Sequence, residues 1–88
     1  MNWSFENLNI LKDFSIYLSV ELDKVDETDL SNELKDWKDT FFTTSSEYLG
    51  ELRVILCRIL KIGCKNLSND IKTNIRLAIS AINNSFKV

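Results

Sequence analysis

The sequence predicts an all-α fold, a compact four-helix bundle that forms one domain over residues 1–88. The chain holds no proline and only two glycines, which indicates long helices with few tight turns. Apolar residues recur at helical spacing in four segments, and with 44% hydrophobic residues the chain is too apolar for a disordered class. The expected helices lie near 4–25, 28–42, 46–62 and 69–86.

The second segment has the clearest helical pattern. Leu30, Leu34 and Trp37 fall on one narrow face, so Trp37 is expected to lie in the core. Thr28 is the expected N-cap, because its hydroxyl can accept a hydrogen bond from a free backbone N–H of the first turn.

The last two segments begin with recognisable capping residues. Thr44 and Glu47 have the spacing of a capping box, and Ser68 stands where the N-cap of the fourth helix is expected. Gly63 follows the broad apolar face of the third segment and is expected to end that helix.

The first segment supports two interpretations. A helix over 4–25 is preferred, but the alternation of apolar and polar residues also fits a strand. The alternative fold is therefore α+β, with an N-terminal β-hairpin at about 2–22 followed by helices. In the helical interpretation a few apolar residues fall outside the main stripe, where neighbours cover them or a partner uses them. These are Phe5, Ile16 and Val20.

The residue types exclude several chemistries. The chain has no histidine, which removes the commonest general base and metal ligand, and its two glycines cannot form a phosphate-binding loop. Cys57 and Cys64 would lie roughly 10 Å apart in a helix, beyond disulfide reach, so two reduced and partly buried thiols are expected. We therefore expect no enzyme, no catalytic residues, no cofactor and no metal site.

Charge is strongly asymmetric along the chain. Residues 1–51 carry 12 acids and four lysines, whereas residues 52–88 carry one acid and seven basic residues. Like charges on one helix flank do not stabilise the helix, so the acidic cluster suggests a surface for a basic protein partner. Trp3 and Phe42 are expected aromatic anchors beside it. The predicted partner-binding residues are Asp23, Asp26, Glu27, Asp29, Glu33, Asp36 and Phe42.

Size and charge together favour a non-catalytic, protein-binding inhibitor. We expect a bacterial immunity or antitoxin type of protein, which neutralises a basic, nuclease-like toxin by occluding its active surface. One alternative is a small nucleic-acid-binding regulator that uses the basic helices over 53–76, although Asp70 stands where a phosphate would lie. Another is a homo-oligomeric structural or adaptor module, so a homodimer stays open. The N-terminus lacks the features of a signal peptide and no segment is long enough to span a membrane, which predicts a cytoplasmic protein without a membrane partner.

Overall fold

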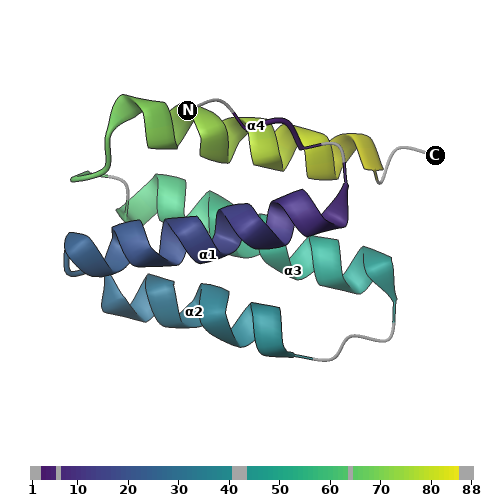
Figure 1. The fold of residues 1–88 in the computed structure, drawn as a ribbon, viewed down its shortest axis with the longest axis horizontal. Helices are drawn as coiled ribbons and strands as arrows, with labels where there is room; N and C mark the ends of the chain where they lie inside the picture. The colour runs from purple at the N-terminus through teal and green to yellow at the C-terminus, as the bar shows by residue number, and fades with distance from the viewer. Residues whose placement is uncertain (1–2, 6, 41–43, 64, 86–88) are drawn as a thin grey trace.

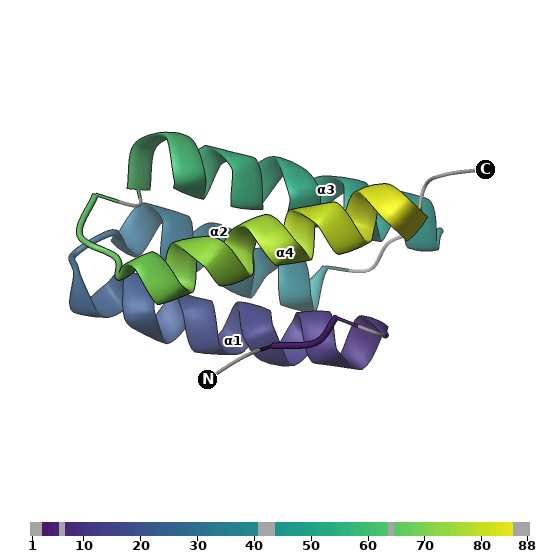
Figure 2. The same cartoon turned by 90° about the horizontal axis from the view of Figure 1, so that it is seen from above.

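A computed structural model of the protein describes residues 3–5, 7–40, 44–63 and 65–85. In these ranges the chain forms four α-helices, and a π-helical turn (Ile59–Gly63) continues the third of them. The helices follow one another up and down and pack into a bundle (Figures 1 and 2). The predicted four-helix bundle is therefore confirmed. The helices are α1 (Leu8–Lys24), α2 (Thr28–Asp39), α3 (Ser45–Arg58) and α4 (Asn69–Ser85).

The first segment is helical, and the alternative β-hairpin at about 2–22 is wrong, since no strand occurs among the residues that the structure describes. Phe14, Leu18 and Leu22 are at most 1% exposed, whereas Ile16 and Val20 are 45% and 49% exposed. Burial thus follows the helical period rather than the alternation of a strand, because α1 packs one face against the rest of the bundle.

Helix α1 begins four residues later than expected. The side chain of Asn7 adopts the N-cap position and accepts a hydrogen bond from the backbone N–H of Ile10 at 3.1 Å. Residues 3–5 run back along the bundle, and the N–H of Trp3 donates to the side-chain oxygen of Asn74 on α4 at 3.4 Å. The N-terminal segment therefore lies against the helices rather than extending α1 (Figure 1).

The bounds of α2 also differ from the prediction. Glu27 rather than Thr28 occupies the N-cap position, without a side-chain cap, because the chain enters α2 directly from a tight turn. The helix ends at Asp39, where Thr40 turns to an extended conformation and its hydroxyl donates to the carbonyl of Asp36 at 2.6 Å.

The capping signals of the last two helices are confirmed. The hydroxyl of Thr44 accepts a hydrogen bond from the N–H of Glu47 at 3.1 Å, and the hydroxyl of Ser68 accepts one from the N–H of Ile71 at 3.3 Å. The last turn of the third segment is π-helical and ends at Gly63, one residue beyond its expected end. Each capping hydroxyl satisfies one of the backbone N–H groups that a helix start leaves free.

The core runs along the centre of the bundle and receives side chains from all four helices. Trp37 is buried, as predicted, and its indole N–H donates to the carbonyl of Tyr48 at 2.7 Å. None of the helices in the described ranges is both long and apolar enough to cross a membrane. The largest fully buried apolar side chains are Phe14, Leu18, Leu22, Leu34, Leu52, Leu56, Ile59, Ile75 and Ile82.

Candidate functional site

The turn between α1 and α2 presents acidic residues at one end of the bundle. Asp26 has a positive φ of 63°, a conformation that aspartate tolerates better than most residues. The N–H of Glu27 then donates to the carbonyl of Leu22 at 2.9 Å, which closes the turn. Asp29 follows in the first turn of α2, where the helix dipole favours a negative charge. Three of the predicted residues, Asp26, Glu27 and Asp29, therefore lie together on this turn.

A groove between α2 and α3 holds two more of the predicted residues. Glu33 and Asp36 line it from α2, and Glu51 lines it from α3. The groove has a volume of about 320 Å³ and is open to solvent. Part of its lining is apolar, because Val54 is 47% exposed there. The complete lining is Glu33, Asp36, Trp37, Thr40, Glu51, Val54, Ile55 and Arg58.

One ion pair crosses this groove. The guanidinium of Arg58 on α3 donates a hydrogen bond to the carboxylate of Glu33 on α2. Both side chains stay about 40% exposed, at 43% and 37%. Exposed pairs of this kind contribute little to stability, so the contact neutralises Glu33 locally without locking the two helices together.

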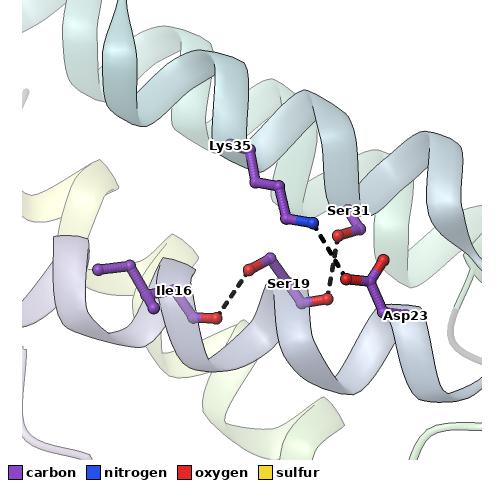
Figure 3. A network of polar contacts seen from close by, with 5 residues as sticks. All are labelled: Ile16, Ser19, Asp23, Ser31 and Lys35. Atoms are coloured by element: carbon purple, nitrogen blue, oxygen red, sulfur yellow. Dashed lines mark hydrogen bonds and ion pairs between the residues drawn. The ribbon is translucent and has the colours of Figure 1, made fainter.

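Asp23 lies near the end of α1 and is also paired within the chain, with Lys35 of α2. The ammonium of Lys35 lies 3.0 Å from its carboxylate, next to Ser31, whose hydroxyl donates to the carbonyl of Ser19 at 3.0 Å (Figure 3). The nearby Ser31 hydroxyl and the Lys35 ammonium lower the pKa of the Asp23 carboxyl, because both favour its charged form. The carboxylate of Asp23 is therefore paired within the chain, although its backbone carbonyl accepts a hydrogen bond from the N–H of Asp26 at 3.3 Å, so Asp23 borders the turn.

The predicted acidic residues thus fall into two groups, those that form an ion pair within the chain and those that do not. Asp23 and Glu33 are ion-paired, whereas in the described ranges no ion pair reaches the other four acids, which are Asp26, Glu27, Asp29 and Asp36. Phe42, the predicted aromatic member, lies outside the described residues.

The basic half of the chain does not neutralise the turn. The connection from α3 to α4, which carries Lys61 and Lys65, lies at the same end of the bundle as the α1–α2 turn (Figure 1). Both lysines are exposed, and no ion pair joins either of them to the turn among the residues described. On the α3–α4 side, Arg53 donates to the side-chain oxygen of Asn83 at 3.3 Å. The bundle is therefore polarised, with most acidic groups of the turn available to solvent.

Sequence reasoning missed the part of the groove that α3 supplies. Glu51, Val54 and Arg58 are spaced at i, i+3 and i+7, so they share one flank of a helix, and this spacing was visible in the sequence. Their position beside α2 was not visible, because it depends on how α2 and α3 pack.

The ring of the expected anchor Trp3 packs against α1. Its centroid lies 5.2 Å from that of Phe14 and 5.7 Å from that of Tyr17, and Trp3 is partly buried. Exposed apolar surface close to the acidic groups comes instead from Val54 in the groove.

The carboxylates at this surface can pair with positively charged side chains. The chain has no histidine, and Cys57 is a free, exposed thiol rather than a partly buried one, while Cys64 lies outside the described residues. In the described ranges no group of three or more potential ligands is arranged to hold a metal ion. No protein-family model matches the chain, and neither curated proteins nor solved structures show a significant match to it.

Proposed function

We propose that this protein is a non-catalytic inhibitor that binds a basic protein partner. The acidic turn, defined as Asp26, Glu27 and Asp29, makes the first contact, and the α2/α3 groove makes the second. The observation that carries the proposal is that no ion pair occupies the acidic turn among the described residues, although the chain carries 11 basic residues.

Electrostatics explains how such a surface would act. Carboxylates that are not neutralised within the chain attract a basic surface over a distance of about a Debye length, roughly 8 Å at physiological salt. This attraction increases the association rate more than the final affinity. The acidic turn therefore selects partners by charge.

The groove supplies an apolar contact in addition to the charge attraction. A lysine or arginine side chain from the partner can lay its aliphatic part along Val54. Its charged end then reaches the carboxylates of Asp36 and Glu51. A contact that combines apolar burial with charge pairing is typical of the residues that dominate binding energy.

An immunity or antitoxin function follows from this chemistry by analogy of size and charge. A nuclease-like toxin binds phosphates with basic residues, and a small acidic bundle can cover those residues and exclude the substrate. The mechanism is occlusion, with one inhibitor bound to each toxin molecule.

Affinity capture with matched variants tests the proposal. The full chain and the variant D26K/E27K/D29K are immobilised and exposed to native lysate, and captured proteins are identified by mass spectrometry. The control is R53E/R76E, which reverses two exposed charges within α3 and α4 rather than at the end of the bundle that carries the acidic turn. A basic protein that the wild type and the control capture, but the acidic-turn variant does not, is then purified.

The purified partner gives the decisive measurement. We expect the wild type to abolish its activity at one-to-one stoichiometry, and the acidic-turn variant to bind roughly tenfold or more slowly, with a weaker dependence on salt. Equal inhibition by wild type and acidic-turn variant would contradict the proposal. Loss of binding in the control alone, with nucleic acid as the captured species, would support the regulator instead.

A further inference from the structure

The outward face of α1 carries an apolar patch that the rest of the chain covers only in part, with the ring of Trp3 against that of Tyr17. Ile16, Tyr17 and Val20 are 45%, 36% and 49% exposed, and they stand within one turn and a half of the helix. Asp13 and Lys24 lie on the same face, on either side of the patch. At 100° per residue these five positions fall within roughly 100° of the helical wheel.

A groove between α1 and α2 adjoins this patch. It has a volume of about 330 Å³, and Ile16 and Val20 form part of its lining. Ser15 and Ser19 are buried beside them, and their small side chains leave room next to the two apolar ones. A shallow groove between two antiparallel helices with apolar residues on one edge can receive the side chains of a third helix. Its remaining lining residues are Leu34, Lys35, Lys38 and Asp39.

The charges at the two ends of the patch indicate which helix packs onto it. Asp13 lies towards the N-terminal end of α1, and Lys24 is its last residue. The Lys24 side chain is 68% exposed, although its ammonium lies 3.1 Å from the carboxylate of Glu21. If a second α1 lies antiparallel on the first, Asp13 of each copy meets Lys24 of the other, and the patches cover one another.

We propose that two copies of this chain associate through an antiparallel contact between their α1 helices. A two-fold axis makes this interface self-complementary, because the same residues supply both halves of the apolar contact and both charge pairs. The patch consists of three apolar side chains per copy, so the dimer is weak and in exchange with the monomer. The α2/α3 groove lies on the other flank of α2 and stays accessible in each copy, so the dimer does not depend on the proposed function.

Sedimentation equilibrium of the full chain from micromolar to millimolar concentration tests the dimer. The average mass is expected to rise from 10.2 kDa towards twice that value. The substitutions I16E and V20E place a carboxylate in the apolar contact and should each weaken association about tenfold or more. The control L77E also changes an exposed apolar residue, which is 48% exposed on α4, and should leave association unchanged.

Charge exchange tests the antiparallel arrangement. The substitution D13K brings two lysines together at each end of the contact, and K24D brings two aspartates together, so each variant should associate more weakly. The double variant D13K/K24D restores opposite charges and should recover dimerisation. Circular dichroism of each variant establishes that the helices are retained.

Three outcomes would overturn the proposal. The first is a wild-type chain that stays monomeric at every concentration. The second is a dimer that L77E disrupts while V20E does not. The third is a monomeric chain in which V20E abolishes capture of a protein partner, which would assign this face to that partner.

Discussion

Arg58 on α3 donates a hydrogen bond to Glu33 on α2, and this contact joins the basic half of the chain to the acidic half across 25 positions of sequence. It is the one ion pair between α2 and the last two helices among the described residues. Had the carboxylates of the acidic turn been paired in the same way, no charge would remain there for a partner. Among the described residues, the basic half of the chain therefore neutralises one carboxylate of α2, that of Glu33.

A double-mutant cycle on Glu33 and Arg58 should give a small coupling energy. We expect E33Q and R58M to lose stability by less than about 1 kcal/mol each, because both side chains are about 40% exposed and solvent screens the pair. Urea unfolding of the wild type, both single variants and the double variant measures the coupling. The coupling should fall further in high salt, and a value above about 2 kcal/mol would mean that the pair is structural.

Trp37 should contribute more to stability than its position near the surface groove suggests. Its indole N–H donates to the carbonyl of Tyr48 at 2.7 Å, and the two rings stack with a centroid distance of 4.2 Å. W37F removes the donor and leaves unfilled volume, so we expect a loss of about 1–3 kcal/mol in urea unfolding. The comparison variant W3F, at a partly buried ring, should lose less. An equal loss in both would contradict this role for the indole N–H.

Ser31 should resist enlargement because α1 and α2 approach closely there. Its side chain is fully buried, and its hydroxyl donates to the carbonyl of Ser19 at 3.0 Å. S31V crowds this contact and should cost about 1–3 kcal/mol, whereas S31A loses only the hydrogen bond and should cost about 1 kcal/mol. Thermal and urea unfolding measure both. The same enlargement at the exposed Ser80 should change stability by less than about 0.5 kcal/mol, and a similar cost at both serines would argue against crowding.

Asp23 should make stability depend on pH in the acidic range. The Ser31 hydroxyl and the Lys35 ammonium hold its pKa below the unfolded value, which is about 3.9 for aspartate. The charged carboxylate therefore stabilises the fold above that value, and the benefit is lost as the pH falls through the lowered pKa. D23N should melt at a lower temperature than the wild type near neutral pH and at the same temperature in strong acid.

Melting curves of the wild type, D23N and K35M from strong acid to neutral pH measure how much the Asp23 carboxylate stabilises the fold. K35M removes the cation from the same pair, so it should reproduce part of the neutral-pH loss. A difference between D23N and wild type that is unchanged in strong acid would show that the carboxylate's charge is not its source.

The alternation of apolar residues from Phe14 to Leu22 shows where local pattern alone was insufficient. The pattern fits both a helix and a strand, and it favours the helix only slightly. The bundle decides between them, because a helix buries Phe14, Leu18 and Leu22 together against the other helices, at the cost of exposing Ile16 and Val20. The helix starts at the second and third connections were predictable, because a hydroxyl cap such as Thr44 or Ser68 acts within a single turn.

The sequence by itself determined the four helices, most of their apolar faces and the crowding of acids before residue 40, since these depend on residue type and on spacing within one turn. Tertiary structure alone decided which acids are neutralised: Asp23 by Lys35 and Glu33 by Arg58. It also decided that Glu51 and Val54 share a groove with Asp36. Charge pairing and groove formation depend on distances between helices, and no local pattern encodes those distances.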